Sequence, residues 1–216
     1  MKKFAFVSDF DGTLSLKDFY HIVIDKYLGQ SGREFYLNWK KNKKIDVEFL
    51  NIIFGQMNRS EDELFQDIID IPLDPYAVEF IELIQARGGD FYILSAGTSY
   101  YIKKLIKHLG LENITIFSME AIYKNRGLEI IPDMSSRYFS TVFGVDKGLF
   151  VDDLKQKYDT VFFAGDSEPD KTACKAATVG FAKSELLVIL ENEGSKIIPF
   201  TDYSQVAKHL LENRLI

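Results

Sequence analysis

The chain has 216 residues, of which 46% are hydrophobic, and this is enough for one core and a small second lobe. Its 26 Lys and Arg residues against 32 Asp and Glu residues give a net charge of −6 without a broad basic patch, so we do not expect a nucleic-acid partner. No apolar run reaches the length of a membrane span, and the single cysteine, Cys174, excludes a disulfide within the chain, so we expect a cytoplasmic protein.

The first predicted element is a buried strand over residues 4–7, which leads into the sequence DFDGTL at residues 9–14. Alternation along a strand points Asp9 and Asp11 to the same side. Two carboxylates at that spacing repel each other unless a cation or a proton lies between them, and Mg²⁺ prefers hard oxygen ligands of this kind. The segment therefore indicates an acidic metal-binding site, with a plain acidic turn as the structural alternative.

Residues 17–72 show helix-like periodicity and no convincing β pattern. Apolar side chains recur at helical spacing in four stretches, at residues 19–27, 35–39, 47–54 and 64–68. The one basic cluster, residues 40–44, is typical of a solvated helix end. Pro72 and Pro75 mark the return to a sheet pattern. We therefore predict a helical insertion directly after the turn that follows the first strand.

Strand and helix patterns alternate after residue 72. The predicted strands are residues 91–94, 114–117, 160–164, 179–182 and 197–198, and the predicted helices are 75–86, 101–109, 147–158, 170–176 and 203–213. Residues 95–98 read as a turn, and residues 121–131 are compatible with a hairpin around Asn125-Arg126-Gly127. Such alternation predicts an α/β fold with a parallel sheet and helices on both faces.

Four segments with chemically useful side chains should meet at one edge of this sheet. Ligands of open α/β sheets bind beyond the carboxyl ends of the strands. The segments expected there are residues 9–13, residues 95–98, the region of Lys147 and residues 165–170. They supply carboxylates, a hydroxyl next to a glycine, a lysine and further carboxylates. These are the groups that phosphoryl transfer requires.

Each of these residues also has a structural alternative. Ser95 could cap the helix that follows it. Lys147 could be an exposed lysine near a helix start, although the helix dipole disfavours a cation there. Asp166 and Asp170 could be cap and turn residues.

In their order and strand placement, the four segments resemble the four motifs of the haloacid dehalogenase (HAD) superfamily of phosphatases. The resemblance covers essentially the whole chain. It implies a Rossmann-like, doubly wound core domain over residues 1–16 and 73–216, with residues 17–72 as a helical C1 cap domain. It also implies a phosphatase that uses Mg²⁺ and an aspartyl-phosphate intermediate, with a small phosphorylated metabolite as its substrate.

The resemblance also implies roles for the acidic residues. Asp9 would be the nucleophile that attacks phosphorus, and Asp11 would be the general acid and then the general base. Mg²⁺ would be held by Asp9, the backbone carbonyl of Asp11, and Asp166. Asp170 would be a further metal ligand, a group behind the ligands, or an anchor for Lys147.

The same resemblance assigns the phosphate-binding groups. Ser95 and the backbone around Ala96 and Gly97 would hold the phosphoryl oxygens. Lys147 would neutralise the charge that spreads over those oxygens in the transition state.

Within the superfamily, the insertion looks like that of the phosphoserine phosphatase branch. It is also similar to the methionine-salvage phosphatase that acts on a methylthio-hydroxyketopentenyl phosphate, whose cap likewise runs through Phe-Gly. Residues 49–55 lack the arginine with which phosphoserine phosphatases hold the substrate carboxylate, and residues 119–146 lack the cysteines expected of the salvage enzyme. Both substrates therefore stay open, together with phosphocholine and phosphoethanolamine.

The candidates for substrate selection in the insertion are Asp18, Tyr20, Phe54, Met57 and Arg59. Asp18 lies nine positions after the nucleophile, where phosphoserine phosphatases carry an acidic residue that meets the substrate amine. The structural alternative is an aspartate that caps the first helix of the insertion.

Other functions fit the sequence less well. Asp11 argues against a dehalogenase, because a halide leaving group needs no acid. Nothing in the sequence indicates the second phosphate site of a phosphomutase. The rival of a different class is a phosphate-sensing module with a vestigial site.

Overall fold

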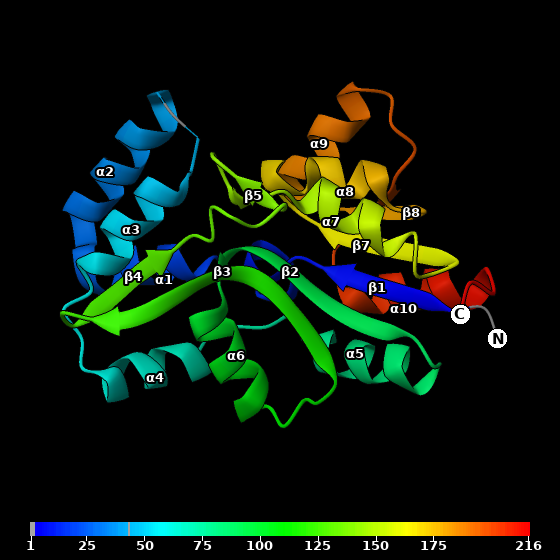
Figure 1. Cartoon of the computed structure of the whole chain (residues 1–216), viewed down its shortest axis with the longest axis horizontal. Helices are drawn as coiled ribbons and strands as arrows, with labels where there is room; N and C mark the ends of the chain where they lie inside the picture. The colour runs from blue at the N-terminus through cyan, green and yellow to red at the C-terminus, as the bar shows by residue number, and fades with distance from the viewer. Residues whose placement is uncertain (1–2, 43) are drawn as a thin grey trace.

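The protein, described here from a computed structural model that covers residues 3–42 and 44–216, is built around a seven-stranded sheet (Figure 1). The strand order is β4-β3-β2-β1-β7-β8-β9, and every pairing is parallel except β3 with β4. The strands are β1 (Phe4–Ser8), β2 (Asp90–Thr98), β3 (Ile114–Lys124), β4 (Gly127–Ile131), β7 (Thr160–Gly165), β8 (Val179–Ala182) and β9 (Ile198–Pro199). A separate two-stranded ribbon pairs β5 (Phe139–Ser140) with β6 (Gly144–Val145).

Helices cover both faces of the sheet, as the sequence predicts. Helices α7 (Lys147–Leu154) and α8 (Lys171–Ala176) lie on one face, and α5 (Ala77–Ala86), α6 (Ser99–His108) and α10 (Tyr203–Glu212) lie on the other (Figure 1). The central strand β1 is buried at all five positions because it is covered on both sides. The fold is therefore the doubly wound α/β arrangement expected from the sequence.

The centre of the core is an aromatic cluster around Phe6 of β1. Its ring lies 4.7 Å from the ring of Phe80, 5.7 Å from that of Phe91 and 6.2 Å from that of Phe162. These rings come from α5, β2 and β7, so the cluster ties the middle strands to the helix layer. This packing fixes the carboxyl ends of β1, β2 and β7 relative to one another.

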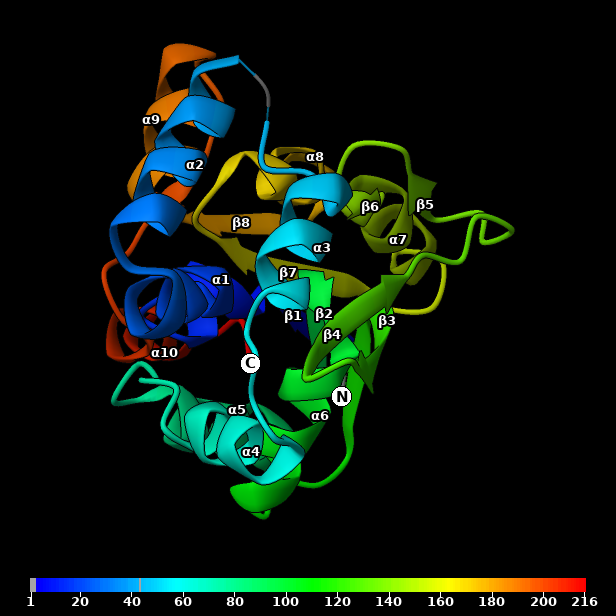
Figure 2. The same ribbon diagram turned by 90° about the vertical axis from the view of Figure 1, so that its left-hand side faces the viewer.

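All four helical stretches predicted between residues 17 and 72 are helical. They are α1 (Phe19–Val23), which continues into a wider turn over Ile24–Leu28, then α2 (Gly29–Asn42), α3 (Val47–Gly55) and α4 (Glu61–Ile69). Helices α1, α2 and α3 form one group, whereas α4 lies beside α6 (Figures 1 and 2). The division of the chain at residues 17 and 72 into a core domain and a cap domain stays a prediction.

The structure departs from the sequence prediction in several elements. The ribbon of β5 and β6 was not predicted, and α7 ends at Leu154 instead of residue 158. Strand β2 continues through Ser95–Thr98, where a turn is predicted, because the chain pairs again with β3 at Met119 after an irregularity. Strand β3 runs on to Lys124 and turns into β4 through Asn125 and Arg126, both at positive φ, so the predicted hairpin is confirmed. A helix that was not predicted, α9 (Ser184–Asn192), follows β8.

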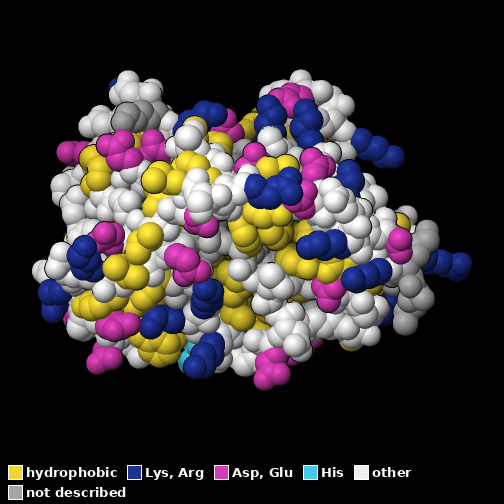
Figure 3. Space-filling view, viewed as in Figure 1, with side chains coloured by type: hydrophobic (Ala, Val, Ile, Leu, Met, Phe, Trp, Pro, Cys, Tyr) yellow, Lys and Arg dark blue, Asp and Glu magenta, His cyan; other side chains and the backbone are white. Residues whose placement is uncertain are grey.

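The surface carries no dominant charge on the face seen in Figure 3, where basic and acidic side chains are interspersed with hydrophobic ones. In the part of the chain that the structure describes, no helix is long and apolar enough to cross a bilayer.

Candidate active site

The four predicted segments meet at a cavity of about 490 Å³ beyond the carboxyl ends of β1, β2 and β7. The helical insertion forms its opposite wall. Among the residues that line the cavity are seven of those predicted from the motifs, namely Asp9, Asp11, Ser95, Ala96, Gly97, Lys147 and Asp166. The fold therefore brings these predicted residues together.

A cluster of three carboxylates lies beside the cavity; Asp9 and Asp166 line it, whereas the buried Asp170 does not. One oxygen from each of Asp9, Asp166 and Asp170 can be chosen so that all three lie within 4.8 Å of one another. Thr13 donates to Oδ1 of Asp166 at 2.8 Å. Gly12, at a φ of +78°, is required beside this cluster, because a Cβ there would lie 2.5 Å from Oδ2 of Asp166.

Lys147 joins two of these carboxylates. Its side chain is 1% exposed, and its Nζ lies 2.6 Å from Oδ1 of Asp9 and 2.6 Å from Oδ1 of Asp170. Burial alone would lower the pKa of Lys147, but the charges of Asp170 and Asp9 outweigh it, so the pKa is raised. The lysine is therefore a permanent cation at the start of α7, held there by two anions.

The acidic cluster carries more negative charge than its lysine balances. Burial, followed by repulsion from Asp170, raises the pKa of Asp9 well above its usual value. Burial and the charges of Asp170 and Asp18 raise the pKa of Asp166 to about 7. An excess of buried carboxylate oxygens is the donor set that Mg²⁺ prefers, so the residues present fit that ion.

Asp170 differs from the other two carboxylates in having both oxygens engaged. Its Oδ1 accepts from Lys147, and its Oδ2 accepts from the backbone amides of Asp166 at 3.0 Å and Ser167 at 3.2 Å. It is fully buried. Of the three roles open for Asp170 from the sequence, this geometry favours the anchor for Lys147.

Asp11 lies in a different environment from Asp9. Its Oδ1 accepts from the backbone amide of Phe19 at 2.9 Å, and its Oδ2 accepts from the hydroxyl of Tyr101 at 2.5 Å and from that of Ser95 at 3.3 Å. Burial, followed by the charge of Asp18, raises the pKa of Asp11 to about 6. A carboxyl with such a pKa can both donate and accept a proton near neutral pH.

Three of the five candidates in the insertion, Asp18, Tyr20 and Phe54, line the cavity. Asp18 precedes α1, but its side chain makes no capping hydrogen bond, and the amide of Phe19 is bound by Asp11 instead. The capping alternative for Asp18 is therefore not realised.

The other two candidates, Met57 and Arg59, do not line the cavity. Met57 is buried in the hydrophobic core. The guanidinium of Arg59 stacks over the ring of Tyr27 at 3.9 Å, and its backbone amide donates to the carbonyl of Arg126 at 2.8 Å. The chain turns away from the site after α3 ends at Gly55, and sequence spacing does not reveal that turn.

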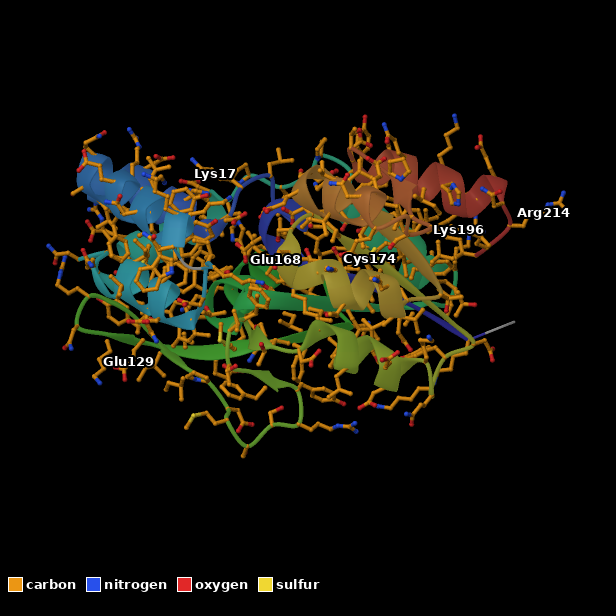
Figure 4. All side chains as sticks on the ribbon, turned by 90° about the horizontal axis from the view of Figure 1, so that it is seen from above. Lys17, Glu129, Glu168, Cys174, Lys196 and Arg214 are labelled. Atoms are coloured by element: carbon orange, nitrogen blue, oxygen red, sulfur yellow. The ribbon has the colours of Figure 1, made fainter. Side chains whose placement is uncertain are left out.

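Several lining residues were not predicted from the sequence. His21 and Tyr36 are among the aromatic lining residues, and burial lowers the pKa of His21, which favours a neutral imidazole. Lys44 belongs to the basic cluster that was predicted to be a solvated helix end. It forms an ion pair with Glu168, and Glu168 lies between the insertion and α8 (Figure 4). Lys43, from the same cluster, lies outside the described residues. Of the lining residues named in this paragraph, only Glu168 could have been expected at the site from the sequence, because it lies within the GDSEPD motif at residues 165–170.

A family described as haloacid dehalogenase-like hydrolase matches residues 6–175. A 2-hydroxy-3-keto-5-methylthiopentenyl-1-phosphate phosphatase from Bacillus velezensis is 24% identical over 93% of this chain and 86% of its own. One of the same name from Bacillus thuringiensis subsp. konkukian is 25% identical over 96% and 97%.

Solved structures support the fold. A substrate-bound phosphoserine phosphatase has a TM-score of 0.69 and 17% identity, covering 97% of this chain and 98% of its own. A probable phosphoserine phosphatase from Vibrio cholerae has a TM-score of 0.70 and 19% identity, covering 100% of this chain and 67% of its own. At this identity the likeness concerns the fold alone.

Proposed function

Because the chain belongs to the haloacid dehalogenase-like hydrolase family, we propose that it is a Mg²⁺-dependent phosphatase that hydrolyses a small phosphomonoester through an aspartyl phosphate. The observation that carries this proposal is the arrangement of Asp9, Asp11 and Lys147 around one cavity. Asp9 is held by the buried ammonium of Lys147, whereas Asp11 has separate hydrogen-bond partners and a pKa of about 6. These environments suit a nucleophile and a general acid, respectively.

In the first step, an oxygen of Asp9 attacks phosphorus. Oδ1 of Asp9 is bound to Lys147, whereas Oδ2 accepts no hydrogen bond from any residue that the structure describes, so Oδ2 is the attacking atom. As the new P–O bond forms, the bond to the leaving oxygen breaks, and Asp11 gives its proton to that oxygen. Lys147 and the backbone near Gly97 bind the phosphoryl oxygens, while the hydroxyl of Ser95 keeps its hydrogen bond to Asp11.

In the second step, Asp11 takes a proton from a water molecule that attacks the phosphoryl group. The bond to Asp9 breaks, which releases inorganic phosphate and restores both carboxyl groups. Mg²⁺, held by Asp9, Asp166 and the backbone carbonyl of Asp11, would supply positive charge against the phosphoryl oxygens. Asp170 keeps Lys147 in place during both steps.

For the substrate, we propose an amine-bearing phosphomonoester of the phosphoserine type. The support is Asp18, a carboxylate on the cavity wall that caps no amide. No arginine of the described chain lines the cavity, and the lysines of the insertion that line it, Lys40 and Lys44, are exposed. A substrate carboxylate therefore has no buried cation of the insertion to meet, which favours phosphoethanolamine or phosphocholine as alternatives to phosphoserine.

A second candidate substrate is the methylthio-hydroxyketopentenyl phosphate of methionine salvage. The curated relatives described above carry that activity in their names and align over nearly the whole chain. The apolar part of the cavity wall, which includes Leu50 and Phe54, would accommodate a methylthio group.

The test begins with para-nitrophenyl phosphate, with and without Mg²⁺. Turnover that requires Mg²⁺, together with an acid-stable phosphoenzyme label lost in Asp9→Asn, supports the proposal. A panel with phosphoserine, phosphoethanolamine, phosphocholine and the salvage intermediate then identifies the substrate class. Phosphate binding without turnover of any ester would instead indicate the vestigial sensing module.

A further inference from the structure

We propose that Tyr101 is a positioning residue for the general acid, a role that rests on the phosphatase function proposed above. Its hydroxyl donates to Oδ2 of Asp11 at 2.5 Å, which is shorter than the 3.3 Å from Ser95 to the same oxygen. A distance this short is typical of an O–H group that donates to a charged carboxylate. Tyr101 comes from α6, outside the four motifs.

The contacts of Asp11 determine which of its oxygens can carry the proton. A carboxyl group offers about four acceptor positions, two on each oxygen. Tyr101 and Ser95 occupy Oδ2, and the amide of Phe19 occupies one position on Oδ1. The remaining position, on Oδ1, is therefore the one from which the proton passes to the leaving group.

The hydroxyl of Tyr101 is held in place by packing from two parts of the chain. The side chain is 1% exposed, and its ring lies 5.8 Å from the ring of Phe10, 4.6 Å from that of Phe19 and 6.3 Å from that of Phe54. Phe10 follows β1, whereas Phe19 and Phe54 belong to the helical insertion. The orientation of the acid thus depends on how the insertion packs against the sheet domain.

Gly97 leaves the space that this contact needs. A Cβ at that position would lie 1.8 Å from the hydroxyl oxygen of Tyr101 and 2.6 Å from Oδ2 of Asp11. A glycine here therefore serves the Tyr101–Asp11 contact as well as the approach of a phosphoryl group.

Tyr101 keeps its own proton throughout the reaction. Burial, followed by the charge of Asp11, raises the pKa of Tyr101 well above its usual value. The proton that reaches the leaving oxygen is the one on Asp11, and the proton that restores Asp11 comes from water. Tyr101 acts by orienting the carboxyl group in both steps.

The test is Tyr101→Phe, which removes one oxygen and keeps the ring. We compare the phosphorylation step, measured by rapid mixing, for phenyl phosphate and para-nitrophenyl phosphate. Phenyl phosphate has the more basic leaving group and depends more on the acid, so its rate should fall by about ten-fold or more, against less than about two-fold for para-nitrophenyl phosphate. Asp11→Asn gives the limit that complete loss of the acid imposes.

Tyr100→Phe is the matched control. The same hydroxyl is removed from the neighbouring residue of α6, where it donates to Glu61 at 2.7 Å. This control should leave the ratio of the two rates unchanged. Melting curves and calorimetric Mg²⁺ titrations should show that Tyr101→Phe is folded and binds the ion with wild-type affinity.

The outcomes separate this inference from the proposed function. Equal losses for the two esters in Tyr101→Phe, or no loss for either, would overturn the positioning role. Absence of turnover by the wild-type protein with either ester would instead overturn the phosphatase proposal on which the role rests.

Discussion

At the scale of single residues, the site depends on how one buried ammonium is shared between two carboxylates. Lys147 contacts Asp9 and Asp170, and Asp170 is further bound by two backbone amides. Asp9 has fewer partners and a strongly raised pKa, because burial and the repulsion from Asp170 outweigh the attraction of Lys147. The folded state thus destabilises the charged form of Asp9, as is typical of a functional carboxylate whose charge is compensated only when a cation or a phosphoryl group binds.

Asp9→Asn should abolish turnover and preserve the fold. An amide is a poor nucleophile, and the change removes one charge from a cluster that carries an excess of negative charge. Without Mg²⁺, the melting temperature should be unchanged or higher, because Lys147 keeps Asp170 as its partner. Activity assays and melting curves check both results. Activity above a few per cent of wild type would exclude the aspartyl-phosphate route through Asp9.

Asp18→Asn should raise KM for amine-bearing phosphomonoesters by about ten-fold, because it removes a charge partner from the leaving group. Any change in kcat that follows from the lower pKa of Asp11 should be the same for amine and neutral substrates. Neutral phosphate esters should be much less affected. Asp62→Asn, which removes the same charge from the exposed surface of α4, is the control. A uniform change across amine and neutral substrates would assign Asp18 a role other than amine recognition.

At the scale of elements, the helical insertion contacts the elements around the sheet at two places. Helix α4 packs against α6, and Tyr100 of α6 donates to Glu61 of α4. On the cavity side, Lys44 pairs with Glu168 and its Nζ lies 5.5 Å above the ring of Phe143. The first contact lies at the exposed end of the insertion, away from the cavity, and the second joins the opposite rims of the cavity.

Lys44→Ala should weaken substrate binding slightly. The side chains of Lys44 and Glu168 are 53% and 39% exposed, so their pair is worth less than about 1 kcal/mol and is screened by salt. KM should rise by no more than about five-fold. A double-mutant cycle with Glu168→Ala, at low and high ionic strength, measures the coupling. Equal effects at both ionic strengths would show that the charges of the pair are not responsible.

At the scale of the whole molecule, the acidic cluster should couple stability to pH and to Mg²⁺. The pKa of Asp166 is about 7 in the folded protein, against about 3.9 for an unfolded aspartate. Between these values the folded state binds more protons than the unfolded state. The corresponding stability is fully present below about pH 4 and is lost as the pH rises through about 7.

The increase in melting temperature caused by Mg²⁺ should therefore be larger at about pH 8 than at about pH 5.5, because protons compete with the ion for Asp166. Scanning calorimetry at both pH values measures the difference. In Asp166→Asn the increase should be small at either pH. A Mg²⁺ effect in the wild type that does not change with pH would show that this cluster is not where the ion binds.

Much of the fold follows from local signals in the sequence. Such signals depend only on residues close together in the sequence, so they can be recognised without the structure. They are the apolar run before Asp9, the alternating periodicities after residue 72 and the turn at Asn125-Arg126-Gly127. Helix α9 was not predicted because its apolar run, residues 186–190, fits a strand as well as a helix, and the first residue of the helix, Ser184, lies at positive φ. Tertiary contacts decide such cases.

The sequence by itself determined the chemical groups of the site, because the motif residues lie at the ends of predicted strands and parallel strands present those ends at one edge. Only the tertiary structure decided what surrounds them. In the tertiary structure Tyr101 donates to Asp11, and Lys147 donates to Asp170. Met57 and Arg59 lie outside the cavity lining. The physical reason is that a helix's periodicity defines its faces, whereas the neighbour that each face meets depends on how helices distant in sequence pack together.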